Sequence, residues 1–231
     1  MIGSSRVAWR EPARAPVLAV LIVAAWLLAV VLGGVAGEFE PGPAQPPLPI
    51  LAALAVPLGI FGLAYALSPR FRDFVLALDL RMLTAAQSWR VIGGMFVFLW
   101  AFDLRPALFA FPAGLGDVAV GIAAVFVLRA MIDEAPGWRR KVLLLNLAGL
   151  LDFVGAFATG ILTSNSALGL LAGEKAEQWA SMGSMPLSLI PTFAVPLWII
   201  LHLISLLQLR ELARRVGSER SRRAPRQEPH A

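Results

Sequence analysis

Six long runs of apolar residues, separated by short polar segments, dominate the pattern of this chain. Each run approaches the roughly 20 apolar residues that an α-helix needs to cross a hydrocarbon core of about 30 Å. We therefore predict an all-α integral membrane protein, a bundle of about six transmembrane helices. The predicted spans cover residues 16–36, 49–68, 85–103, 112–131, 142–163 and 187–209.

The segments around these runs complete the expected organisation. Residues 70–84 mix apolar and charged side chains and predict an interfacial helix before the third span. Residues 1–210 would form a single transmembrane domain, followed by a basic tail, 211–231, that we expect to be disordered. The first span has a second interpretation, a secretory signal peptide with a cleavage site at Gly34-Val35-Ala36, before Gly37, although its apolar run is long for one.

The composition agrees with a membrane protein and excludes several kinds of catalytic and metal-binding site. The 231 residues are 58% hydrophobic and 15% charged, whereas soluble domains carry about 25% charged residues. The absence of cysteine excludes disulfides, thiolate metal ligands and thiol nucleophiles. There is no zinc or di-iron histidine pair, and His230 lies in the tail, so His202 has no partner for bis-histidine haem ligation. We expect no metal and no cofactor.

The basic residues indicate an orientation. Of the 20 Lys and Arg, all except Arg90, Arg105 and Lys175 lie in the N-terminal segment, in the connections after the second and fourth spans, or in the tail. By the positive-inside rule both termini are then cytoplasmic. The abundant Ala, Gly, Pro and Arg suggest a bacterial inner membrane. The net charge of +5 is therefore a topology signal, and we expect the lipid bilayer rather than nucleic acid as the partner.

Several polar residues fall inside the predicted spans, where a charge costs about 2.5–3.5 kcal/mol on insertion scales. At about 1.5 Å of rise per residue, most of their depths fall in one band that an arginine side chain can bridge. Small residues share their helix faces, with Gly94 beside the third-span pair and Gly149 on the fifth span. We therefore predict a buried polar cluster whose members are Gln87, Arg90, Asp117, Asn146, Asp152 and His202.

The charges of this cluster do not balance. Arg90 contributes +1, whereas Asp117 and Asp152 contribute −2. A buried net charge must be neutralised, by a protonated carboxyl group, a protonated His202 or a bound cation. We expect Arg90 to pair with one acid, preferably Asp152, and Asp117 to be the protonated one. The simpler alternative is an ion pair that only holds the bundle together.

Helix-breaking residues near the cluster suggest irregular backbone around a cavity. Such backbone is tolerated at membrane depth where it is buried in protein or lines a cavity. An outer loop, 164–186, has the spacing of a half-buried helix over the outer mouth. The predicted breaks are at Pro112, Gly114, Gly116, Pro191 and Pro196.

Residues 114–117, Gly-Leu-Gly-Asp, resemble the GxGD signature of intramembrane aspartyl proteases. That resemblance implies an acid–base pair in which Asp152 would be the second aspartate. Residues 106–108 echo the Pro-Ala-Leu motif of the same class. The motif order, the missing tyrosine before Asp152 and the number of spans depart from the family, so membership is not assigned.

Three function classes remain open. We favour a small-solute or ion permease, proton-linked through the buried cluster. The alternatives are a non-catalytic membrane subunit or assembly partner, acting with another protein or as a homo-oligomer, and an intramembrane enzyme using the Asp117/Asp152 pair. We expect a non-enzymatic role.

Overall fold

The computed structural model describes residues 14–42, 45–173, 175–179 and 181–223. This part of the chain is helical and contains no strand. The prediction of an all-helical chain with six apolar helices is confirmed, since six helices have the length and apolar composition to cross a membrane. They are Val17–Val35, Leu48–Leu67, Leu80–Ala101, Ala107–Ile132, Trp138–Leu162 and Ile190–Arg215.

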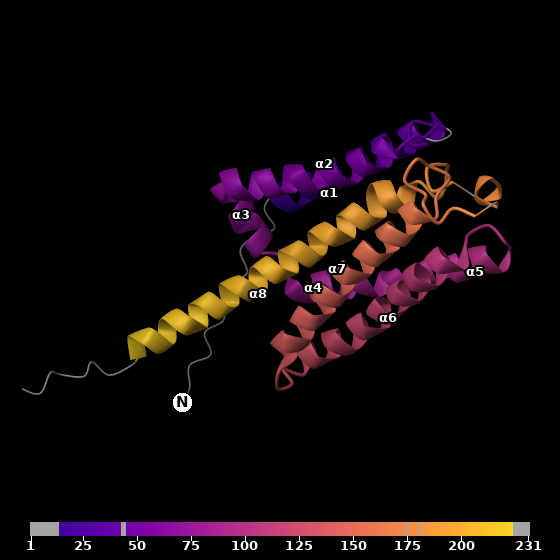
Figure 1. Cartoon of the computed structure of the whole chain (residues 1–231). Coiled ribbons are helices and arrows are strands. Elements are labelled where there is room, and N and C mark those ends of the chain that lie inside the picture. Colours follow the sequence, from indigo (N-terminus) through magenta and orange to yellow (C-terminus); the bar gives the residue numbers. More distant parts are fainter. Residues whose placement is uncertain (1–13, 43–44, 174, 180, 224–231) are drawn as a thin grey trace, which may run out of the picture.

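The helices form a bundle with a tight three-helix centre (Figure 1). Helix α6 (Ala107–Ile132) packs against the third span on one side and α7 (Trp138–Leu162) on the other. Helix α8 (Val195–Arg223) lies against α7, and α2 (Leu48–Leu67) covers α8. Helix α1 (Arg14–Val35) is peripheral and packs near the start of the sixth span, where Trp26 meets Phe193 at 4.8 Å between ring centroids.

The two ends of the bundle differ in charge. The 36–47, 102–106 and 163–189 connections lie at one end, with Arg105 and Lys175 (Figure 1). The turns after α2 and α6 lie at the other end with the last part of α8. That second end carries the basic residues Arg70, Arg72, Arg129, Arg139, Arg140, Lys141, Arg210, Arg214 and Arg215.

The predicted interfacial helix 70–84 is shorter than expected. Helix α3 (Pro69–Leu76) begins after the Ser68 cap, whose side chain accepts from the Phe71 amide at 3.2 Å. Asp79 then starts a new helix by accepting from the Arg81 amide at 2.7 Å. Residues 80–84 therefore belong to the third span, because Leu83 packs into the core with Val75.

The third span combines three helical segments. Residues Leu80–Ala86 (α4) and Met95–Ala101 (α5) are α-helical, and the stretch between them, Gln87–Gly94 (η1), is a 3₁₀ helix. Residues three apart share a face in a 3₁₀ helix. Gln87, Arg90 and Gly93 are therefore aligned, and the expectation that Gly94 shares that face is wrong.

The backbone break predicted at Pro112, Gly114 and Gly116 does not occur. Helix α6 runs without interruption from Ala107 through Pro112 to Ile132. A proline within a helix removes one backbone hydrogen bond. Close packing against the third span offsets this loss, because Ala110 and Ala113 are fully buried and Gly114 lies against the Gly93 carbonyl.

The irregular start predicted for the sixth span is present. Residues Ile190–Ala194 (η3) form a π-helical turn that contains Pro191, and α8 follows with Pro196 in its first turn. Helix α8 then continues to Arg223, so residues 211–223 are helical rather than disordered. A Glu211–Arg215 ion pair at 3.0 Å spans one of these turns. Residues 224–231 of the predicted tail lie outside the described residues.

The outer loop differs from its prediction. Residues 164–186 form turns with one short 3₁₀ segment, Ala176–Gln178 (η2), instead of a half-buried helix. Leu168 and Leu171 are exposed, whereas Met182 packs against the outer apolar cluster. The apolar spacing that suggested a helix therefore included residues that do not face the bundle.

Two apolar clusters lie on either side of the middle of the bundle. An inner cluster joins α6 to the start of α7 through Ala124, Val127 and Leu145. An outer cluster joins the third span to the start of α6 through Phe96 and Phe109, whose ring centroids are 4.9 Å apart. The polar side chains gather between these two clusters.

Candidate functional site

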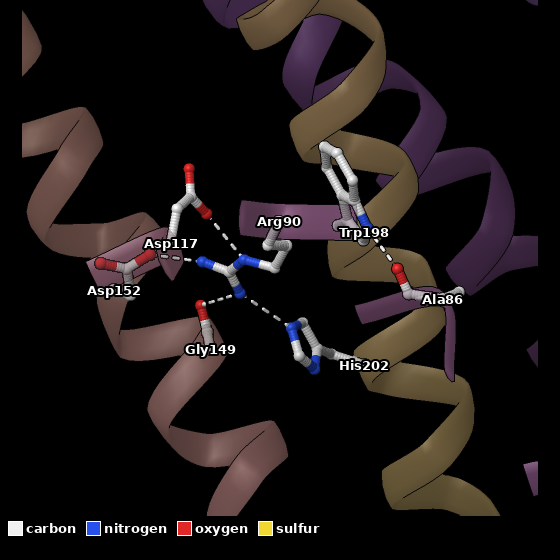
Figure 2. A network of polar contacts seen from close by, with 7 residues as sticks. All are labelled: Ala86, Arg90, Asp117, Gly149, Asp152, Trp198 and His202. Carbon is white, nitrogen blue, oxygen red and sulfur yellow. Dashed lines mark hydrogen bonds and ion pairs between the residues drawn. The ribbon is translucent and has the colours of Figure 1, made fainter. Parts of the chain in front are cut away.

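Arg90 is the centre of the polar cluster and is fully buried (Figure 2). Its Nε donates to Asp117 Oδ1 on α6 at 2.7 Å, and its Nη2 donates to Asp152 on α7. Its Nη1 donates to the Gly149 carbonyl at 3.2 Å and faces His202 Nε2 on α8 at the same distance. The guanidinium lies 3.9 Å from the centroid of the Phe153 ring. One side chain thus connects four spans.

The predicted ion pair is confirmed, with one change. We expected Arg90 to bind one acid, and it binds both Asp117 and Asp152 through different nitrogens. A single Asp→Asn replacement therefore leaves a carboxylate for Arg90.

Hydrogen bonds define the state of His202. The Asn146 amide Nδ2 donates to the Val142 carbonyl at 2.7 Å, which turns its Oδ1 toward His202 Nδ1 at 2.8 Å. An amide oxygen only accepts, so Nδ1 carries the hydrogen. Nε2 then accepts from Arg90, since a guanidinium only donates. His202 is neutral in this arrangement and does not supply the missing positive charge.

Glycines allow the helices to bring these groups together. A Cβ atom on Gly149 would overlap the His202 ring and Arg90 Nη1. A Cβ atom on Gly116 would overlap the Asp152 carboxyl group, so Gly116 matters for close approach rather than as a helix break. Small residues at helix contacts are typical of close packing between membrane helices.

A cavity of about 260 Å³ extends from the 163–189 end of the bundle to Asp117. Its inner walls are apolar and include Phe96, Phe109 and Phe153. Its rim includes Glu40, Ser166, Glu177 and Trp179. The Asp117 side chain keeps 17% of its surface exposed, whereas Arg90 behind it keeps none. Asp117 therefore joins the cavity to the ion-pair network.

The sequence analysis did not assign Arg105 to the site. This residue lies in the short connection before α6, yet it is 4% exposed, lines the cavity and stacks over Phe109 at 4.5 Å. Burial lowers the pKa of Arg105 to about 10, which keeps the guanidinium charged at neutral pH. No periodicity marks a buried arginine in a short loop; its apolar neighbours were the only signal.

The remaining predicted residues have different positions. Gln87 is buried, but neither polar atom of its amide has a hydrogen-bond partner among the described residues. Pro191 lines the cavity, and Pro196 is buried without lining it. No group of three or more potential metal-ligating side chains occurs in residues 14–42, 45–173, 175–179 and 181–223.

These features define a helical protein with six membrane-length apolar helices and a buried, arginine-centred polar network. The chain belongs to the family described as domain of unknown function DUF8737, whose model matches residues 47–210. The match includes all members of the network and the whole of α2, and it leaves out α1. No curated protein and no solved structure matches the chain.

Proposed function

We propose that this protein is a small-solute permease of a bacterial inner membrane, with both termini in the cytoplasm and transport coupled to protons through Asp117. The observation that carries the proposal is the contact between a cavity and a charged network. The cavity ends on Asp117, and Asp117 is bonded to Arg90. An ion pair that only stabilised the bundle would need no such access.

Charge balance supports the proton coupling. Arg90 offsets one of the two carboxylates, and the hydrogen bonds of His202 keep that ring neutral. Uptake of one proton by an acid makes the network neutral, and its release restores one negative charge. Asp117 suits this role better than Asp152, since Asp117 lines the cavity.

The same geometry gives little support to proteolysis. An aspartyl dyad shares a proton between two carboxyl groups that act on one water molecule. Here each carboxyl group binds a nitrogen of Arg90, which lies between them. The resemblance of residues 114–117 to the GxGD motif is therefore confined to the sequence.

The proposed orientation predicts the accessibility of the connections. Cysteines introduced in the 36–42 and 164–173 segments should react with an impermeant maleimide in intact cells. A cysteine that replaces Glu134, in the turn between α6 and α7, should react only after the cells are opened. Labelling of the Glu134→Cys variant from outside would reverse the orientation.

Proton-coupled transport can be measured in liposomes that contain the purified protein and a trapped pH-sensitive dye. We expect benzoate, benzylamine, alanine or glucose, supplied outside, to cause internal acidification beyond that of empty liposomes, which neutral benzoic acid enters without a protein. Asp117→Asn should reduce this signal at least tenfold, because the amide cannot carry the proton. It should keep the fold, since the oxygen of the new amide still accepts from Arg90 Nε.

Asp152→Asn is the matched control, because it removes the same charge from the same network away from the cavity. It should be as stable as Asp117→Asn and retain more of the signal. If no solute acidifies the liposomes beyond the empty control, or if Asp117→Asn leaves this excess unchanged, the permease is refuted. A role as a non-catalytic subunit would then replace it.

A further inference from the structure

The outer half of the cavity is rich in hydrogen-bond donors. Arg105 places a buried guanidinium on its wall. The indole Nε1 of Trp179, on the same cavity, is buried and has no acceptor among the described residues. A buried N–H group without an acceptor is destabilising, so a ligand with acceptor oxygens would be stabilised there.

The inner half offers apolar surface of limited size. The rings of Phe96, Phe109 and Phe153 line it down to Asp117. Phe109, under Arg105, and Asp117 are about two helical turns apart on α6, or roughly 12 Å. The volume of about 260 Å³ is below the roughly 300–1,000 Å³ of pockets for drug-sized ligands. The occupant is therefore a small molecule with one polar end.

We propose that the cavity binds a small organic monocarboxylate. Its carboxylate would be received by Arg105 and Trp179, and its apolar body would lie against the phenylalanine rings. Arg105 also interacts within the chain, so the ligand would compete for a guanidinium that is already engaged. Glu40 and Glu177 lie at the exposed rim, where solvent screens their repulsion.

This inference rests on the proposed function and supplies its substrate class. An ionised Asp117 at the closed end would repel an anion, and protonation would remove that repulsion. Binding of the proton and binding of the anion would therefore favour each other. Arg105 acts here as a binding residue, whereas Asp117 couples binding to the proton.

Calorimetry on the full-length protein in lipid nanodiscs tests the ligand class without a proton gradient. Benzoate is the probe, and benzylamine and benzyl alcohol are its cationic and neutral counterparts of similar shape. Benzoate should bind at least tenfold more tightly than either. Arg105→Gln should weaken benzoate binding at least tenfold. Arg129→Gln, which removes an exposed arginine from the opposite end, should leave it unchanged.

Trp179→Phe is a second variant; it keeps an aromatic ring, smaller than the indole, and removes the N–H donor. It should weaken benzoate binding severalfold. Three results would overturn the proposal: tighter binding of benzylamine than of benzoate, absence of benzoate binding to the wild type, or benzoate binding by Arg105→Gln and Trp179→Phe that equals that of the wild type. Benzoate binding through Arg105 without protein-dependent proton movement in liposomes would refute the permease and keep the site. Proton movement with alanine or glucose but no benzoate binding would do the reverse.

Discussion

Replacing Arg90 with alanine is expected to destabilise the protein by about 3–5 kcal/mol, because breaking a buried ion pair leaves a charge uncompensated. Arg90 is fully buried and binds both Asp117 and Asp152. Its loss removes bonds to three helices at once and leaves the acids facing each other across an empty space. Reversible unfolding in mixed micelles, followed by circular dichroism, measures this difference.

Two variants distinguish the effect of uncompensated buried charge on stability from the effect of losing any arginine. Arg129→Ala removes an exposed helical ion pair with Asp133 and should cost no more than about 0.5 kcal/mol. Arg90→Met combined with Asp117→Asn and Asp152→Asn removes all three charges and should recover part of the lost stability. If Arg90→Ala unfolds like Arg129→Ala, the network does not stabilise the bundle.

The sequence predicted which residues form the network, but it did not predict which of their atoms form hydrogen bonds and ion pairs. Arg90, Asp117, Asp152 and His202 were expected to meet, because costly polar groups at similar depth in one bundle tend to find each other. The contacts of Arg90 confirm that expectation. Which nitrogen binds which acid depends on helix rotations of a few degrees, and a sequence period does not resolve these.

The conformation of the third span was not predictable from its own residues. Residues Gln87–Gly94 have no local reason to prefer a 3₁₀ helix. The backbone of this segment packs closely on α6, where a Cβ atom on Gly121 would overlap the Val91 amide. Tertiary packing therefore selects the tighter helix and brings Gly93, rather than Gly94, to the face of Arg90.

Pro112 and Arg105 were misjudged for a related reason. Proline is a reliable local signal, yet the packing of Ala110 and Ala113 keeps α6 helical through it. Arg105 looked like an ordinary loop charge, since the cavity that it lines is completed by residues of the 163–189 connection, which are distant in the sequence. Both outcomes are decided by long-range contacts.

Gly149→Ala should have an effect comparable to the loss of Arg90, although it adds only one methyl group. That carbon would lie closer to His202 and to Arg90 Nη1 than a real Cβ approaches any heavy atom. His202 is held by Asn146 at 2.8 Å, and Arg90 is held by its two acids, so neither side chain can move without losing a bond. We expect a net destabilisation of about 2–4 kcal/mol from overpacking and a weakened charged hydrogen bond.

Gly155→Ala on the same helix is the matched control. A Cβ atom there would meet nothing within 4 Å, so only the backbone effect of the substitution remains. In a helix interior this effect favours alanine over glycine by up to about 1 kcal/mol. Gly155→Ala should therefore leave the unfolding midpoint unchanged or raise it, while Gly149→Ala lowers it. Equal midpoints for the two variants would mean that α7, α8 and Arg90 are not packed as closely as the network requires. The close contact of Gly149 with His202 and Arg90 would then be refuted.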